Sequence, residues 1–170
     1  DGASQETYGR QRIGGDFSQA VDACRRVAAA GLPLEITFAP TRINLSDAEA
    51  VIDLARSLGA FRLNSGRLMS LGTAVKLWDR LEPSEAQYAG FLTLLERKER
   101  ELAGKMELCF RPFSLQEEAA ARVDSPSGTL LVLPDGRVKP SVTVDFTCAD
   151  LKRQTFLEAW DAYTAAWKDK

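Results

Sequence analysis

Residues 34–64, LEITFAPTRINLSDAEAVIDLARSLGAFRLN, decide the fold class of this chain. In LEITFA the apolar and polar side chains alternate with the period of a β-strand, and Pro40 ends the run. A helical apolar stripe follows, headed by Ser46 and Glu49 at the spacing of a capping box. AFRLN alternates again and predicts a second strand. A strand, a helix and a strand with short connections make a βαβ unit, whose strands are parallel.

The pattern continues on both sides of this unit. Upstream, Asp16 precedes a helical stripe that stops at Gly31. Downstream, Ser84 and Gln87 form a second capping box ahead of a long helix, whose charged run ERKERE predicts a solvated end. MELCFRPF then predicts another strand, and SLQEEAAAR predicts a short helix with a further capping box at Ser114. This alternation predicts an α/β fold in which helices cover a parallel sheet.

From residue 125 onward the sequence becomes rich in β-forming residues. TLLVL and RVKPSVTV are joined by a Pro-Asp-Gly turn at 134–136, which predicts a β-hairpin near 129–144. TFLEAWDAYTAAW predicts a closing helix near 155–168, with aromatic residues three to four positions apart. We interpret this aromatic stripe as a packing face rather than a ligand platform. The tail is therefore expected to form a small α+β domain.

Composition narrows the possible chemistry. The chain has 170 residues, 22 basic against 24 acidic, and no histidine, which excludes a histidine general base and the Ser-His-Asp and Cys-His triads. The near balance of charge gives no reason to expect nucleic acid or an anionic membrane as a partner. No apolar run approaches the roughly 20 residues of a spanning helix, so we expect a cytoplasmic protein. The scattered Cys24, Cys109 and Cys148 predict buried free thiols rather than a zinc site or a disulfide framework.

The first part of the chain carries a series of motifs that occur together in one enzyme family. They are Asp1-Gly2-Ala3, Glu6-Thr7, Arg10-Gln11-Arg12, Thr41-Arg42-Ile43-Asn44 and Leu58-Gly59-Ala60. With FRLNSGRLMSLGTA they resemble the middle of a radical S-adenosylmethionine (radical SAM) enzyme, from the end of its fourth barrel strand onward. The resemblance implies that residues 1–104 form the C-terminal half of a partial TIM-like βα barrel. This half barrel would hold the family's fourth to sixth strands with their helices.

The tail, residues 105–170, resembles the SPASM domain, or its shorter twitch form, that ends many radical SAM enzymes acting on peptides and proteins. Its leading pattern sets one cysteine before, and one shortly after, the glycine of a Pro-Asp-Gly turn. Here Ser125 and Ser141 occupy the two cysteine positions around Gly136. A serine hydroxyl is a hard, protonated and weak replacement for a thiolate, so we expect no auxiliary iron-sulfur cluster and no metal in this tail.

The family resemblance also says where the catalytic centre would lie. The family binds its 4Fe-4S cluster with a Cys-x3-Cys-x2-Cys loop and S-adenosylmethionine with a Gly-Gly-Glu-like segment, and both would lie upstream of Asp1. We therefore expect the chain alone to bind no cofactor and not to be catalytic. S-adenosylmethionine and one 4Fe-4S cluster are expected if the N-terminal half is supplied, by a longer chain or by a partner subunit. The implied function is modification of a peptide or protein by hydrogen abstraction with a 5′-deoxyadenosyl radical.

A second interpretation is a catalytically dead, radical-SAM-like partner or peptide-binding protein. The serines at 125 and 141 favour it, because an auxiliary cluster would have been lost. The exposed sheet edges of a half barrel could accept a peptide as an added strand, and they also favour homodimerisation. Three cysteines upstream of Asp1 are required by the enzyme interpretation and not by this one.

Candidate binding residues follow from the barrel architecture, since barrel enzymes place their active sites at the carboxyl ends of the strands. The residues after the implied fourth, fifth and sixth strands that could bind S-adenosylmethionine or substrate are Arg10, Arg12, Thr41, Asn44, Asn64 and Arg67. A guanidinium pairs well with a carboxylate, and short polar side chains could hydrogen-bond ribose or substrate. Each residue also has an ordinary alternative, as a surface arginine or as a turn residue. No residue is assigned a catalytic role.

Overall fold

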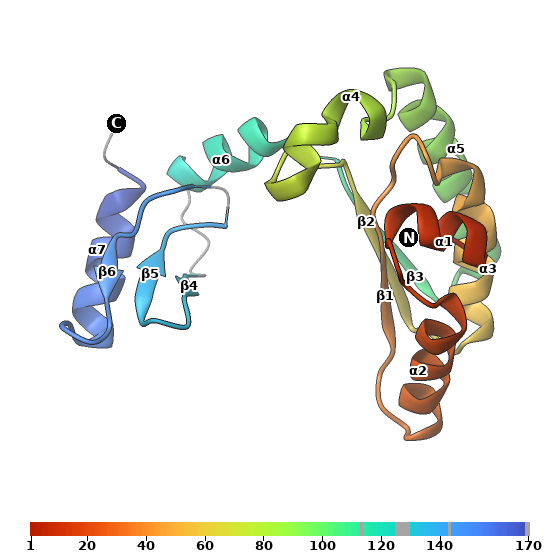
Figure 1. Cartoon of the computed structure of the whole chain (residues 1–170), viewed down its shortest axis with the longest axis horizontal. Coiled ribbons are helices and arrows are strands. Elements are labelled where there is room, and N and C mark those ends of the chain that lie inside the picture. Colours follow the sequence, from red (N-terminus) through yellow and green to blue (C-terminus); the bar gives the residue numbers. More distant parts are fainter. Residues whose placement is uncertain (113, 125–129, 143, 169–170) are drawn as a thin grey trace. The chain divides into compact units, whose positions relative to one another are not determined.

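The computed structural model describes residues 1–112, 114–124, 130–142 and 144–168. The chain divides into two compact units, Asp1–Pro112 (unit 1) and Phe113–Lys170 (unit 2). Figure 1 shows helices and a small sheet in each unit. Each unit has its own hydrophobic core.

Unit 1 is built on a three-stranded parallel sheet. Its strands are β1 (Glu35–Phe38), β2 (Arg62–Gly66) and β3 (Glu107–Arg111), in the spatial order β1-β2-β3. The strands predicted from LEITFA and AFRLN are confirmed as β1 and β2, and so is their parallel pairing. A spatial order that follows the chain order is what successive βα crossovers of one hand produce.

Helices cover one face of this sheet (Figure 1). They are α2 (Phe17–Ala29), α3 (Ala48–Ser57) and α5 (Glu85–Leu102). Phe91 of α5 lies between Phe38 and Phe110, with its ring centroid 5.9 Å from each. Ala55 and Leu63 have no exposed surface. Interlocked aromatic and aliphatic side chains thus join the outer helices to all three strands.

The opposite face of the sheet is polar. Side chains alternate along a strand, so the residues between the core positions project to this second face. They are Glu35, Thr37, Arg62, Asn64, Glu107, Cys109 and Arg111, all exposed or half-buried. Arg62 forms ion pairs with Glu35 at 3.3 Å and with Glu107 at 2.7 Å, and so links the three strands across this face. We call these seven residues the polar face.

Two of the predicted helix starts in unit 1 are confirmed and one is wrong. The Asp16 side chain caps α2, and Ser84 and Gln87 form the capping box of α5. The box predicted at Ser46 does not form. A 3-10 turn, Leu45–Asp47, precedes α3 and takes Ser46 into the helical segment, so its side chain is not at the cap position.

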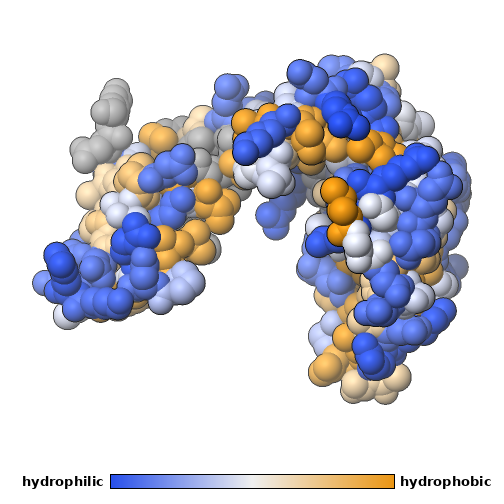
Figure 2. Space-filling view, viewed as in Figure 1, coloured by the Kyte–Doolittle hydropathy of each residue, from blue (hydrophilic) through white to orange (hydrophobic). Residues whose placement is uncertain are grey.

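Three helical segments of unit 1 were not predicted. They are α1 (Gln5–Gln11), the 3-10 helix η2 (Gly72–Leu77) and α4 (Trp78–Leu81). None of them contains a buried residue, so none carries an apolar stripe that points to a core. Figure 2 shows hydrophobic surface around α4, and Val75 and Leu77 of η2 are among the exposed residues. Within the described residues, no helix has the length and apolar character needed to cross a membrane.

The charged run ERKERE is only partly solvated. The Lys98 side chain is 8% exposed, and its ammonium lies 2.8 Å from Asp53, 3.1 Å from Glu49 and 3.3 Å from Glu101. The hydrogen bond to Asp53, followed by those to the other two carboxylates, raises the pKa of Lys98 above its usual value. The prediction of a solvated end is therefore wrong for this residue, which ties α5 to α3.

The boundary between the units differs from the one expected at residues 104 and 105. The chain divides between Pro112 and Phe113, because β3 belongs to the sheet of unit 1. Its Leu108 and Phe110 pack against the core of that unit. Strand MELCFRPF therefore completes the first unit rather than opening the tail.

Unit 2 contains a small antiparallel sheet and two described helices. The elements are α6 (Leu115–Asp124), β4 (Leu131–Val132), β5 (Arg137–Lys139), β6 (Ala149–Asp150) and α7 (Phe156–Ala166). Strands β4 and β5 are the predicted hairpin, α7 is the predicted closing helix, and the capping box at Ser114 is present. Gly136 has φ of +88°, the left-handed conformation that the turn requires. Strand β6, which pairs with β5, was not predicted.

The aromatic stripe of α7 is a packing face over part of its length. Tyr163 is fully buried and Trp167 is 8% exposed, whereas Phe156 is 62% exposed. The Tyr163 hydroxyl and the Trp167 indole nitrogen are buried, and neither has a hydrogen-bond partner among the described residues. Burial of unpaired donors costs free energy, and the apolar contacts of the helix and its capping box at Thr155 and Glu158 offset this cost.

Candidate functional site

A pocket lies at the carboxyl ends of the three parallel strands, where enzymes with parallel sheets commonly bind ligands. Its volume is about 320 Å³, at the lower end of ligand pockets. The lining residues are Thr37, Phe38, Ala39, Asn64, Ser65, Gly66, Arg67 and Arg111. They come from all three strands and the residues that directly follow β1 and β2, and we call this the strand-end pocket.

Gly66 lets the ends of β2 and β3 approach closely. A Cβ atom at this position would lie 3.1 Å from the carbonyl oxygen and 3.3 Å from the Cβ of Arg111. The amide of Arg67 donates to the same carbonyl at 3.0 Å. The close backbone contact brings the last residue of β3 to the edge of the pocket.

Arg67 is held by α5. Its guanidinium pairs with Glu85 and lies 4.6 Å from the ring centroid of Tyr88. The Tyr88 hydroxyl accepts a hydrogen bond from the amide of Leu68 at 2.9 Å, and burial raises the pKa of this hydroxyl. The residues after β2 are therefore fastened to the first turns of α5, and the charge of Arg67 is balanced by a carboxylate.

Asn64 and Arg111 complete the polar wall of the pocket. The Asn64 amide donates to a carboxylate oxygen of Glu35 on the neighbouring strand. Arg111 is exposed and forms no ion pair with any residue that the structure describes. Within the part of the chain that the structure describes, Arg111 is thus a pocket-lining residue whose charge no carboxylate balances.

The structure places Thr41 and Asn44 elsewhere, in the turn after β1. Asn44 is fully buried and Thr41 is 4% exposed. The Asn44 amide oxygen accepts from the amide and hydroxyl of Thr41 at 2.7 and 3.1 Å, and its nitrogen donates to the carbonyls of Asp1 and Ala39, both at 3.0 Å. All the strong hydrogen-bonding positions of Asn44 are used inside the protein, which makes it a structural residue.

Arg10 and Arg12 lie outside the strand-end pocket. Arg10 pairs with Glu6 one turn earlier on the exposed surface of α1. Arg12 follows α1 and pairs with Asp1. Of the six predicted binding residues, only Asn64 and Arg67 line the pocket together.

Thr37 and Arg111 are lining residues that were not predicted. Thr37 follows from the alternation along β1, which assigns it to the polar face. Arg111 ends β3, a strand that was predicted but was assigned to the tail. The carboxyl end of this strand was therefore not searched for binding residues. Correct assignment of that strand to the sheet would have identified Arg111.

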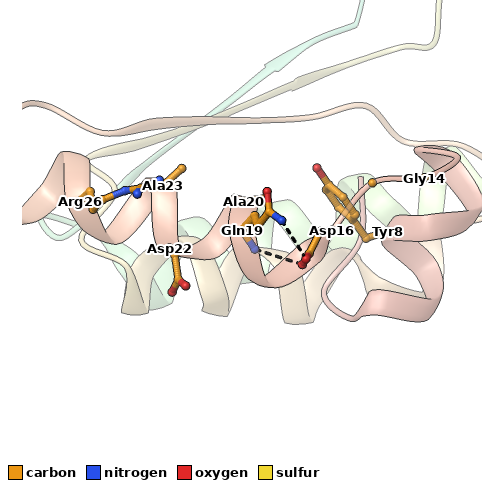
Figure 3. A pocket seen from close by; sticks show the side chains of 9 residues that line it. Tyr8, Gly14, Asp16, Gln19, Ala20, Asp22, Ala23 and Arg26 are labelled. Atoms are coloured by element: carbon orange, nitrogen blue, oxygen red, sulfur yellow. Dashed lines mark hydrogen bonds between the residues drawn. The ribbon is translucent and has the colours of Figure 1, made fainter.

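A second, more open cavity of about 730 Å³ lies beside α1 and α2 (Figure 3). The carboxylate of Asp16 caps α2 by accepting hydrogen bonds from Ser18 and Gln19. The hydrogen bond from the Ser18 side chain is the main cause of the lowered pKa of Asp16. Asp22 pairs with Arg25 at 2.8 Å. These carboxylates therefore stabilise the helix rather than converge on a ligand.

The described residues hold no group of three or more histidine, cysteine or acidic side chains that could bind a metal ion. Cys24, Cys109 and Cys148 are separate free thiols, and each is half-buried rather than buried as predicted. Burial raises the pKa of Cys148 and so disfavours its thiolate. Ser125 lies outside the described residues, and Ser141 is half-buried. The donor set of this part of the chain does not fit an iron-sulfur cluster.

Comparison with known proteins finds a distant curated relative. The chain is similar to a curated protein named PqqA peptide cyclase from Ruegeria pomeroyi, with 31% identity over 134 residues. The matched region is 76% of this chain and 36% of that protein. The chain thus spans about a third of the length of the curated relative it matches. No protein-family model matches the chain.

Proposed function

We propose that this chain is the C-terminal part of a radical SAM enzyme that modifies a peptide or protein and is not catalytic by itself. The chemistry would be hydrogen abstraction from the substrate by a 5′-deoxyadenosyl radical. The observation that carries the proposal is the strand-end pocket, at the carboxyl ends of parallel strands that follow one another in space as in the chain. Similarity to a peptide cyclase supports a peptide as the substrate.

The two-sided sheet of unit 1 supports the proposal of a half barrel. In a βα barrel one face of the sheet packs against the outer helices and the other faces the interior. Here the helices cover one face, and the polar face bears charged and amide side chains. A polar interior suits a barrel that binds a substrate rather than one filled by apolar packing.

The contacts of Asn44 support a further strand beside β1. Asn44 joins the carbonyl of Asp1 to that of Ala39, which directly follows β1. A strand that ended at Asp1 would therefore finish beside the end of β1. Parallel pairing there would extend the sheet in the direction that the proposed upstream half requires.

The proposed cofactors are S-adenosylmethionine and one 4Fe-4S cluster. The three described cysteines are separate and form no group that could bind a cluster, so residues upstream or on a partner subunit would hold it. For the tail we propose a SPASM-like or twitch-like unit without an auxiliary cluster, because Ser125 and Ser141 stand at the two cysteine positions. The hairpin and closing helix of unit 2 are compatible with such a tail.

The test is to purify the natural-length gene product without oxygen and to measure its iron and its cleavage of S-adenosylmethionine. About four irons per chain and release of 5′-deoxyadenosine in the presence of a reductant are expected, while the 170-residue chain alone should give neither. Substantially more iron would contradict the proposal of an empty tail. Absence of both iron and 5′-deoxyadenosine after reconstitution would refute the enzyme and leave a radical-SAM-like binding protein.

A further inference from the structure

We infer that the strand-end pocket binds a carboxylate and that Arg111 is the residue that recognises it. The inference begins with the charges of the pocket. Its eight lining residues include two arginines and no aspartate or glutamate. Because Arg67 is paired with Glu85, Arg111 supplies the positive charge of this small concave site that no described carboxylate balances, and such a site favours an anion.

Arg111 differs from the other arginines around the pocket in its partners. Arg67 pairs with Glu85, and Arg62 pairs with Glu35 and Glu107. Arg111 has no ion pair within the described part of the chain. The N–H donors of the Arg111 guanidinium are therefore available to a ligand. Those of Arg67 and Arg62 contact carboxylates of the protein.

Neutral polar groups stand on the strands beside Arg111. Gly66 pairs with Arg111 in the register of β2 and β3, Asn64 precedes Gly66 on the same face, and Thr37 pairs with Asn64 on β1. Adjacent strands lie about 4.8 Å apart, so the backbones of β1 and β3, which carry Thr37 and Arg111, lie roughly 10 Å apart. The pocket volume of about 320 Å³ accommodates a carboxylate together with a short carbon chain.

The planar guanidinium fits a carboxylate because it can donate two parallel hydrogen bonds. In the proposed function this carboxylate has two possible sources, an acidic group of the peptide substrate or the amino-acid part of S-adenosylmethionine. That assignment of sources rests on the proposed function, whereas the anion site itself rests on the charges and contacts of the pocket.

The test uses the 170-residue chain with 15N-labelled arginine side chains and two probes. The first probe is the tripeptide acetyl-Ala-Glu-Ala-amide, compared with its glutamine counterpart, and the second is S-adenosylhomocysteine. Each is titrated while the Nε–H signals are followed by NMR. The variant Arg111→Gln identifies the Arg111 signal, and Arg111→Lys keeps the charge but loses the forked donor geometry.

We expect at least one probe to shift the Arg111 signal. Arg111→Gln should weaken its binding about tenfold or more, as loss of a charged hydrogen bond predicts, and Arg111→Lys should give an intermediate loss. Arg100→Gln removes the same charge from an exposed arginine of α5 outside the pocket, and should change the affinity less than about twofold.

The two probes separate the sources of the carboxylate. Binding of the glutamate tripeptide but not of its glutamine counterpart assigns the site to the substrate, and binding of S-adenosylhomocysteine alone assigns it to the cofactor. Absence of any Arg111 shift, or equal affinity of Arg111→Gln and the unchanged chain, would overturn the inference. These results need neither iron nor turnover, so they are independent of the test of the proposed enzyme.

Discussion

Replacement of Asn44 by alanine tests whether this residue serves the scaffold or a ligand. The substitution removes four hydrogen bonds, two accepted from Thr41 and two donated to Asp1 and Ala39. Each contributes about 1 kcal/mol to the free energy of unfolding, and a buried amide or carbonyl left without a partner costs about 1–3 kcal/mol. We expect Asn44→Ala to lower the free energy of unfolding of unit 1 by about 3 kcal/mol or more, a large part of the roughly 5–15 kcal/mol typical of domains.

The measurement must read unit 1 separately from unit 2. Hydrogen exchange followed by mass spectrometry, in peptides that cover β1 and α3, reports the local free energy of opening at increasing urea concentration. The matched control is Asn64→Ala, which removes an amide from the half-exposed polar face, where it bonds one exposed carboxylate. We expect this control to cost less than about 1 kcal/mol.

A loss below about 1 kcal/mol in Asn44→Ala, or equal losses in the two variants, would refute this reasoning. The hydrogen bonds of Asn44 would then contribute little to the fold. Asn44 would again be a candidate for ligand binding, as its position after a strand first indicated.

Three further predictions concern other parts of the chain. Tyr163→Phe removes a buried hydroxyl that has no partner among the described residues, so the thermal midpoint of unit 2 should rise by the equivalent of about 1 kcal/mol, and a lower midpoint would reveal a partner for the hydroxyl. Gly66→Ala sets a Cβ 3.1 Å from the Arg111 carbonyl, so urea unfolding should show a loss of about 1–2 kcal/mol, and unchanged stability would show that β3 moves away freely. The hydrogen bonds from Ser18 and Gln19 lower the pKa of Asp16 in the folded protein. The ionised Asp16 therefore stabilises the fold fully above the pKa of an unfolded aspartate, near 4, and this stabilisation is lost as the pH falls through the lower pKa of the folded state. Unfolding of Asp16→Asn at a series of acid pH values should therefore depend less on pH than unfolding of the unchanged chain, and equal pH dependence would contradict this account.

Regular secondary structure was predictable where a segment packs a periodic face on the core. The alternation in LEITFA and the stripe of α2 are examples, and the residues concerned are buried or packed against the core as expected. Helix α1 has no buried residue, and its contacts are the Ser4 cap, polar side chains and the ring contact between Tyr8 and Phe17. Its sequence therefore has no apolar period that predicts a helix. Strand β6 is two residues long and is defined by its pairing with β5, a tertiary contact that no local pattern contains.

The sequence predicted that the candidate site lies at the carboxyl ends of the strands, but it did not predict which side chains point into the pocket. The rule of carboxyl ends led to Asn64 and Arg67, which line the pocket. The same rule led to Asn44, whose side chain turns inward because the turn after Pro40 needs its hydrogen bonds. In the turn after a strand the side chains no longer alternate regularly, so the sequence does not predict the direction in which each one points.

The alternation along β1, β2 and β3 separates two kinds of constraint on sequence change. Helix-facing residues such as Phe38 and Leu63 fill a close-packed core, where a change of volume is costly. Their immediate neighbours Thr37 and Asn64 are exposed or half-buried and support little of that packing. Relatives of this protein could therefore acquire new ligand preferences by substituting every second residue of three short strands, while the intervening residues preserve the same scaffold.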